Sequence, residues 1–215
     1  MTSAKPQRYA ILILLAAAIT ATLVLNYSQQ QTRARITANQ DAHALRLVTA
    51  VLPESGYENE PTRDVIMLSD PELPGSSLPL PAYRARTGDQ AIATAVTAIA
   101  GNGYVGPIRL LIGLDIDGNI IRVRAIEHRE TPGLGDRIEP GKSDWINLFD
   151  GLSANAGRPQ QLRRDGGDFD QISGATITSR AVLETVQATQ NYYLKNQTMI
   201  NAPLQDGLTP RKTGE

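Results

Sequence analysis

The hydrophobic pattern of the chain begins with one long apolar run, Ala10 to Leu25, inside a stretch without charge from residue 9 to residue 32. An α-helix rises ~1.5 Å per residue, so a run of this length can cross the ~30 Å hydrocarbon layer of a bilayer. Tyr9 and Tyr27 stand where interfacial aromatic residues are common. We therefore predict an N-terminal tail, residues 1–8, followed by a transmembrane anchor, residues 9–27. A tail this short is easily left in the cytoplasm.

A cleaved signal peptide is the main alternative to an anchor, but no clean small-x-small cleavage site follows the apolar run. A buried core helix fits poorly, because the run is apolar on all sides. Lys5 and Arg8 precede the run and Arg33 and Arg35 follow it, so the positive-inside rule barely decides the orientation.

Residues 28–53 follow with apolar side chains mostly on one helical stripe, which predicts a stalk helix that Pro53 ends. We interpret His43 as a residue of this stripe rather than as a metal ligand. The next segment, residues 54–81, is rich in loop-forming residues and has one short β-like run at 65–68. Pro79 and Pro81 argue against a central strand there.

Alternation of apolar and polar residues predicts strands at 82–86, 107–115 and 119–128, and the alanine-rich run 91–100 is an ambiguous strand. Asp117 and Gly118 form a hairpin turn signal between the last two strands, and we take the DxDGN spelling there as a turn, not a calcium loop.

Helical features dominate the C-terminal part. A short helix is predicted at 144–149 with Ser143 as its N-cap, and a turn at 165–167. Val182, Val186, Thr189 and Tyr193 recur at helical spacing, which predicts a helix over 179–195 with Thr178 or Ser179 as its N-cap. Strands in the middle and helices around them indicate an α+β domain over residues 54–200, with a central antiparallel sheet flanked by helices and a disordered tail at 201–215.

Composition removes several classes of function. The net charge is −1, so no electrostatic argument favours nucleic acid as a partner. The chain has no cysteine, which excludes disulfides and thiolate-ligated metals or iron–sulfur clusters. Because there are only two histidines, we expect no metal site. We also expect no catalytic residue and no NADH site in this chain.

The candidate chemistry lies just before the last helix, in the run Asp170-x-x-Ser173-Gly174-Ala175-Thr176-x-Thr178. The first turn of a helix offers free N–H groups and the positive end of its dipole, and small residues let a ligand approach the backbone. The run is therefore a candidate anion or phosphate site, although such a pattern is more often a plain loop and cap.

The same run resembles the flavinylation motif D-x-x-S/T-G-A-T of two covalent-FMN protein families. These are the G subunit of the Rnf electron-transport complex and the C subunit of the sodium-translocating NADH:quinone reductase. The runs ETPGLGD at 130–136, SDWI at 143–146 and DGGDFD at 165–170 also resemble the Rnf G subunit in order and spacing, over nearly the whole chain.

The resemblance implies a membrane-anchored subunit that relays electrons through an FMN joined by its phosphate to Thr176. It implies that Ser173, Gly174, Ala175, Thr178, Glu130, Thr131, Gly133 and Leu134 bind the flavin and that Asp170 serves its attachment. A separate flavin transferase would attach the FMN, and the partners would be the other subunits of a translocase in the cell inner membrane. The domain would be periplasmic, and the chain would be an electron carrier without a complete active site of its own.

Three questions stay open on the residues themselves. Arg137, Lys142, Arg163 and Arg164 are all candidate counter-charges for the phosphate. Trp145 is either a core aromatic residue, which we favour, or a residue that stacks near the cofactor. The C subunit of the sodium-translocating reductase is the alternative family. A non-redox scaffold domain and a hydrolase that uses Ser173, Thr176 or Thr178 as nucleophile are alternatives of other classes; the hydrolase lacks a G-x-S-x-G elbow.

Overall fold

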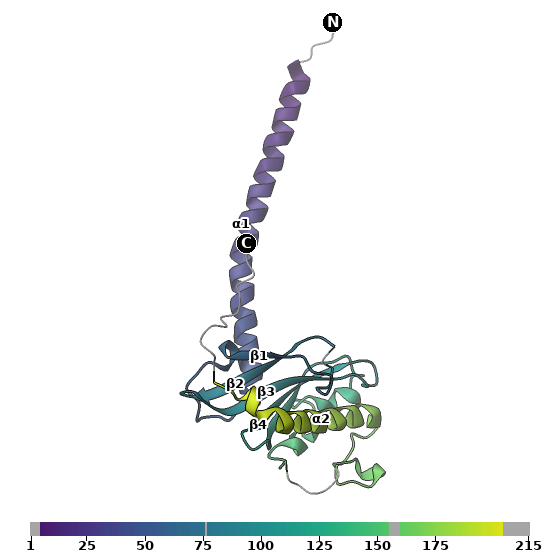
Figure 1. Ribbon diagram of the computed structural model, residues 1–215. Helices are drawn as coiled ribbons and strands as arrows, with labels where there is room; N and C mark the ends of the chain where they lie inside the picture. Colours follow the sequence, from purple (N-terminus) through teal and green to yellow (C-terminus); the bar gives the residue numbers. More distant parts are fainter. Residues whose placement is uncertain (1–4, 76, 155–159, 204–215) are drawn as a thin grey trace. The chain divides into compact units, whose positions relative to one another are not determined.

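The structure is a computed structural model that describes residues 5–75, 77–154 and 160–203; within its first helix it describes side chains for residues 13–27, 29, 39 and 41–49. The chain divides into two compact units, residues 1–43 and residues 44–215. The first consists of most of helix α1 (Lys5–Thr49), and the second holds the end of α1, a sheet and helix α2 (Thr176–Ile200) (Figure 1).

Helix α1 covers the predicted anchor and most of the predicted stalk, and it ends four residues before Pro53. Its described apolar side chains between Ile13 and Leu25 are exposed. Within the described part of the chain, no helix is both long and apolar enough to cross a membrane. The side chains of residues 9–12, where the predicted anchor starts, lie outside the described set.

The second unit is built on an antiparallel meander in the order β1-β2-β3-β4-β5. The strands are β1 (Val65–Leu68), β2 (Leu80–Thr87), β3 (Gln90–Ala100), β4 (Ile108–Asp115) and β5 (Ile120–Glu127). The α+β prediction and every predicted strand are confirmed. Pro81 is in β2, but the pairing with β3 begins one residue later, at Ala82, so the proline occupies a position that pairs with β1.

Alanine-rich β3 is a central strand, and the sheet has cores on both faces. On one face Ala93 and Ala95 pack with Val48, Val51 and Leu52, from the last turn of α1 and the residues just after it. Small side chains fit there because the covering segment lies close to the sheet. The ambiguity of residues 91–100 is thereby explained: their alanines suit a tightly covered strand.

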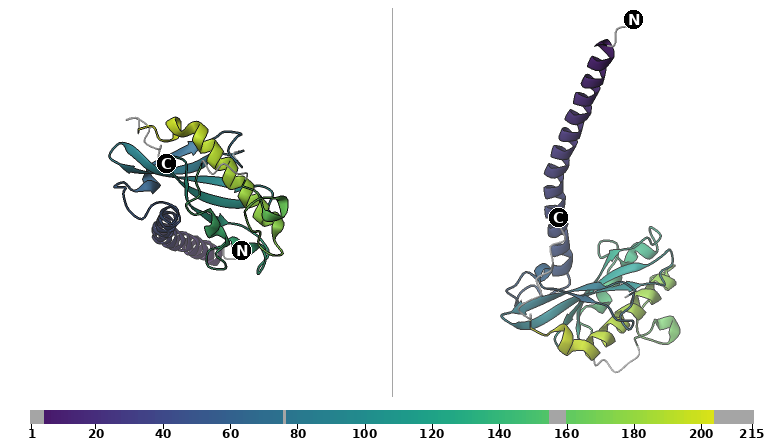
Figure 2. Two further views of the ribbon diagram at one scale, coloured as in Figure 1. Left: turned by 90° about the horizontal axis from the view of Figure 1, so that it is seen from below. Right: turned by 45° about the horizontal axis from the view of Figure 1, so that its top comes forward.

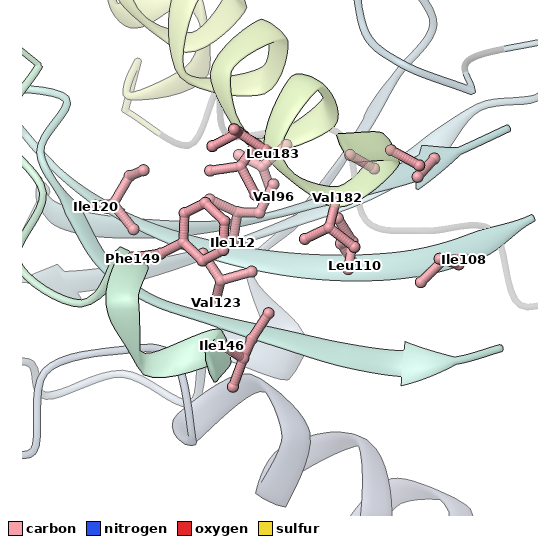
Figure 3. Packing of buried hydrophobic residues seen from close by; sticks show 14 of the residues in the cluster. Val96, Ile108, Leu110, Ile112, Ile120, Val123, Ile146, Phe149, Val182 and Leu183 are labelled. Atoms are coloured by element: carbon pink, nitrogen blue, oxygen red, sulfur yellow. The ribbon is translucent and has the colours of Figure 1, made fainter. Parts of the chain in front are cut away.

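The other face carries the main core, beneath α2. Figure 2 shows α2 running along the sheet in both views. Close up, Val96, Ile112 and Val123 of the sheet meet Val182 and Leu183 of α2 and Ile146 and Phe149 of the 3₁₀ helix η3 (Trp145–Phe149) (Figure 3). The predicted apolar face of the last helix is confirmed, since Val182, Val186, Thr189 and Tyr193 are all fully buried.

Helix α2 begins three residues before the predicted start and continues to Ile200. Ala175 occupies the N-cap position without a side-chain cap bond, so the prediction of Thr178 or Ser179 as N-cap is wrong. The hydroxyl of Ser179 instead donates to Ala175 O and accepts from Ile172 N–H, which holds the preceding loop against the first turn. The consequence is that Thr176 is the first residue of the helix.

Of two smaller predictions, the short helix at 144–149 starts one residue later than predicted, and the turn at 165–167 is confirmed. The short helix after Ser143 starts at Trp145, with Asp144 at the N-cap position, although the Ser143 hydroxyl does accept a hydrogen bond from Trp145 N–H. The turn at 165–167 is confirmed as the end of the 3₁₀ helix η4 (Arg163–Asp165).

Of the predicted tail, residues 204–215 lie outside the described chain. Ala202 O accepts hydrogen bonds from Arg84 and Arg86, so the described part is attached to β2.

Candidate functional site

A pocket of about 330 Å³ lies where α2 begins. Three segments that are far apart in the sequence form it: the loop between β3 and β4, the loop after β5, and the start of α2. Its lining consists of Tyr104, Glu130, Thr131, Leu134, Gly135, Gly174, Ala175, Thr176, Ile177 and Thr178. The structure thus brings together all predicted cofactor residues except Ser173 and Gly133, which are not part of this lining.

Glu130 holds the three segments together. Its side chain is buried, with the residue 5% exposed, and it accepts the Thr178 hydroxyl at 2.5 Å and Val105 N–H at 3.1 Å. Each carboxylate oxygen therefore has a donor from another segment, which satisfies a charge that is costly to bury alone. The backbone N–H of Glu130 in turn donates to His128 Nδ1 at 3.3 Å.

Two glycines make room for this arrangement. A Cβ on Gly135 would lie 2.6 Å from Glu130 Oε2, and a Cβ on Gly103 would lie 2.9 Å from Glu130 Oε1. Gly174 has φ of +80°, which favours glycine, and a Cβ there would meet Leu134 Cδ2 at 2.9 Å. The loops around residues 134 and 174 are therefore in contact, and the sequence leaves space for the pocket by omitting side chains.

The start of α2 gives the pocket its polar end. As the first helical residue, Thr176 presents its hydroxyl beside backbone N–H groups that have no partner within the helix. The positive end of the helix dipole adds to this field, so the position favours an anion. Helix α2 begins at Thr176, three residues nearer to the motif than the apolar periodicity predicted. This earlier start supports the predicted anion site, because it places the free N–H groups at the motif.

The rim of the pocket is apolar and open to solvent. Leu134 is 44% exposed and Ile177 is 49% exposed, and Tyr104 is also exposed. A pocket with apolar walls and a few polar groups is typical of cofactor sites. Tyr104, Gly135 and Ile177 were missed by the sequence reasoning, and the glycine-rich run 101–106 was the signal that could have indicated the first of them.

A charged cluster supports the loop after β5. Lys142 Nζ lies 2.9 Å from Asp136 Oδ2 and 2.7 Å from Glu139 Oε1, and these contacts hold the pKa of both carboxyls below the ordinary range. Because His128 Nδ1 accepts from Glu130 N–H, its Nε2 carries the proton and can donate to Glu139 Oε1 at 3.1 Å. Through His128, the charged cluster is thus connected to the backbone of the buried Glu130.

The other predicted residues are placed as follows. Trp145 is 8% exposed and packs edge-to-face on Phe149 with ring centroids 5.5 Å apart, so it is a core aromatic residue. Its Nε1 donates to Asp170 O at 2.5 Å. The Asp170 carboxylate pairs with Arg163 at 2.8 Å, outside the pocket lining. Arg164 Nη1 lies 3.4 Å from Thr176 Oγ1.

Comparison with known proteins agrees with this geometry. An FMN-binding domain family matches residues 103–191, which include all the pocket-lining residues. Relatives described as the G subunit of an ion-translocating oxidoreductase complex are found in several bacteria. The one from Pseudomonas aeruginosa (strain UCBPP-PA14) is 42% identical over 81% of this chain and 83% of its own length.

Two further relatives have the same description. The protein of Shewanella loihica is 37% identical over 86% of this chain and 89% of its own length. The protein of Vibrio vulnificus is 37% identical over 84% of this chain and 86% of its own length. Identity at this level over most of both chains establishes common descent, so the chain belongs to the family of G subunits of ion-translocating oxidoreductase complexes, which is the Rnf family that its motif resembles.

Proposed function

We propose that this chain is the flavoprotein subunit of an ion-translocating oxidoreductase complex and that it relays electrons through an FMN attached by its phosphate to Thr176. The observation that carries the proposal is the position of Thr176: it is the first residue of α2 and lines the pocket. A hydroxyl at a helix N-terminus suits a phosphate ester, because the ester's negative charge meets free N–H groups.

The residues present fit an FMN. The pocket volume of about 330 Å³ lies in the ~300–1,000 Å³ range of small-molecule sites. Its polar end at Thr176 and Thr178 suits the phosphate and the hydroxylated chain, and the apolar rim of Tyr104, Leu134 and Ile177 suits an aromatic ring system. When bound, the flavin supplies the redox chemistry, and the protein holds it and excludes water from part of it.

The attachment is a phosphoryl transfer in this proposal. The Thr176 oxygen bonds to the phosphorus that carries the riboflavin half of FAD, and the bond between the two phosphates breaks. AMP leaves, and the hydroxyl proton passes to a base of the transferase or to water. In this proposal a separate flavin transferase carries out the step, as the family resemblance implies.

The membrane position is also a proposal. The chain is a single-pass subunit of the inner membrane with its second unit in the periplasm, beside the other subunits of the complex. The exposed apolar side chains of α1 between Ile13 and Leu25 support an anchor, since such a surface is unfavourable in water. The absence of charge between residues 9 and 32 supports it as well.

The experiment is intact mass and in-gel flavin fluorescence under denaturing conditions. The native chain and the Thr176→Ala variant are each co-expressed with a flavin transferase. We expect one FMN ester on the native chain and none on Thr176→Ala. Flavin that survives the Thr176→Ala change would move the attachment point to another residue, with Thr178 the next candidate.

A known substrate of the transferase, expressed in the same cells, is the control for activity. If that substrate is labelled and the native chain is not, the electron-carrier function is wrong, and a scaffold function becomes the better explanation of the family fold.

A further inference from the structure

We propose that Arg164 is the cation that binds the phosphate of the cofactor at Thr176. The inference rests on the proposed function and goes beyond it, because it selects one side chain from four basic candidates near the motif. The selection comes from what each cation contacts in the folded chain.

Arg164 is directed at the attachment point. Its Nη1 donates to Thr176 Oγ1 at 3.4 Å, a long hydrogen bond that joins η4 to the first residue of α2. A phosphate ester on Thr176 would have its non-bridging oxygens only two bonds from Oγ1. A guanidinium that reaches Oγ1 is therefore within reach of those oxygens, which are better acceptors because they carry the charge.

The backbone around Arg164 is held in place on both sides. Leu162, just before η4, is buried. Across the base of the loop, Arg163 N–H donates to Phe169 O, and Phe169 N–H donates to Gln161 O. Arg180 of α2 binds Asp165 Oδ2 at 2.7 Å, which ties η4 directly to the helix. Arg164 thus starts from a fixed position above the helix N-terminus, and the entropy lost on binding an anion is reduced.

The other basic candidates are directed elsewhere. Arg163 pairs with the Asp170 carboxylate at 2.8 Å, and Lys142 pairs with Asp136 and Glu139. Arg137 is exposed and lies in the 3₁₀ helix η2 (Gly135–Ile138), in the loop after β5. Among these four, only Arg164 has a side-chain contact with the motif threonine in the described part of the chain.

The arrangement also explains how an anion is tolerated beside acidic residues. Asp170 is close in sequence to Thr176 and would repel a phosphate, but its pairing with Arg163 offsets that charge. Arg164 and the N–H groups of the first turn of α2 then approach the phosphate from two elements. One arginine offsets the acidic residue, and the next one in the chain binds the ligand.

The test uses the full-length chain, labelled by a flavin transferase, in four forms: native, Arg164→Gln, Arg164→Lys and Arg137→Gln. The Arg137→Gln variant is the matched control, because it removes the same charge from an exposed position outside the pocket. Two quantities are measured: the rate of labelling by intact mass, and the ³¹P chemical shift of the finished phosphoester as salt is increased.

We expect Arg164→Gln to label roughly two- to fivefold more slowly than the native chain, in proportion to the loss of one exposed charge-assisted contact. Its ³¹P shift should differ from the native value at low salt and converge with it at about 1 M salt, where the ion pair is screened. Arg164→Lys should be intermediate, because it keeps the charge but not the planar fork, and Arg137→Gln should match the native chain.

The ³¹P shift separates a phosphate contact from a role in recognising the transferase. Slow labelling with an unchanged shift would overturn the inference, as would equal effects of Arg164→Gln and Arg137→Gln. Failure of the inference is distinct from failure of the proposed function: in the first case the native chain still carries FMN on Thr176, and in the second it carries none.

Discussion

The hydroxyl of Thr178 donates to Glu130 Oε2 at 2.5 Å, across a sequence separation of 48 residues. This bond joins the first turn of α2 to the loop after β5, and Val105 N–H binds the other oxygen of the same carboxylate at 3.1 Å. The shape of the pocket therefore depends on one buried glutamate.

Replacing Glu130 should destabilise the fold in proportion to the donors that lose their acceptor. Glu130→Ala leaves Val105 N–H and the Thr178 hydroxyl unpaired in a buried place, which costs about 1–3 kcal/mol per group. Glu130→Gln keeps an acceptor oxygen and should cost clearly less. The free energy of unfolding from urea titrations measures both. Glu127→Ala, at the exposed end of β5, is the control and should stay within about 1 kcal/mol of native. Equal losses for Glu130→Ala and Glu127→Ala would contradict the role given to Glu130.

Adding a methyl group at Gly135 should disturb the same contact. The new Cβ would lie 2.8 Å from Glu130 Cβ and 3.1 Å from Thr178 Oγ1, so the backbone or the glutamate must move. We expect Gly135→Ala to cost about 1–3 kcal/mol in unfolding free energy. Gly141→Ala is the matched control, because nothing lies within 4 Å of its added Cβ and its φ is not positive. A Gly135→Ala variant as stable as Gly141→Ala would show that the space beside Glu130 is not required.

Asp64 is buried between two arginines of β2. It binds Arg84 Nη2 and Arg86 Nε, each at 2.5 Å, and all three side chains are nearly inaccessible. Asp64→Asn leaves two buried guanidinium charges without a compensating charge, so we expect a loss of about 3–5 kcal/mol. The exposed pair of Glu60 and Arg63 is the comparison, and Glu60→Gln should cost no more than about 1 kcal/mol. Chemical unfolding of both variants tests this, and a loss below about 1 kcal/mol for Asp64→Asn would contradict it.

Acid should weaken the loop after β5. Lys142 lowers the pKa of Asp136 and of Glu139 from their ordinary values of 3.8 and 4.5. A lowered pKa in the folded state stabilises the fold above the ordinary pKa, and this contribution is lost as the pH falls through the lowered value. The melting temperature of Lys142→Met should therefore lie below native at neutral pH, and the gap should close in acid below the ordinary carboxyl range. A gap that stays constant across that range would contradict the assignment.

Much of the fold could be predicted from local pattern. Residues 107–115 and 119–128 alternate around an Asp-Gly turn, and they form β4 and β5 within one residue at each end. Val182 and Tyr193 mark the buried face of α2. Such patterns succeed because strand and helix periodicity is set by neighbours a few residues apart.

The start of α2 could not be predicted this way. The buried face indicated residue 179, whereas the helix begins at Thr176, because Ser179 binds the loop through Ile172 N–H rather than capping the helix. The difference matters for function, since it makes the motif threonine the first helical residue. A serine hydroxyl can either cap a helix or bind the backbone of residues before it, and the sequence alone does not show which of the two it does.

By itself the sequence determined the strands, the last helix and the family, and through the family resemblance it predicted which residues bind a flavin. Only the tertiary structure decided that Tyr104, the loop after β5 and residues 174–178 line one pocket and that Glu130 is buried there. It also decided that Arg164 rather than Arg163 faces Thr176. The reason is physical: periodicity is a local property of the chain, but a pocket and its charge pairs arise from side chains that become neighbours only when the sheet and helix pack.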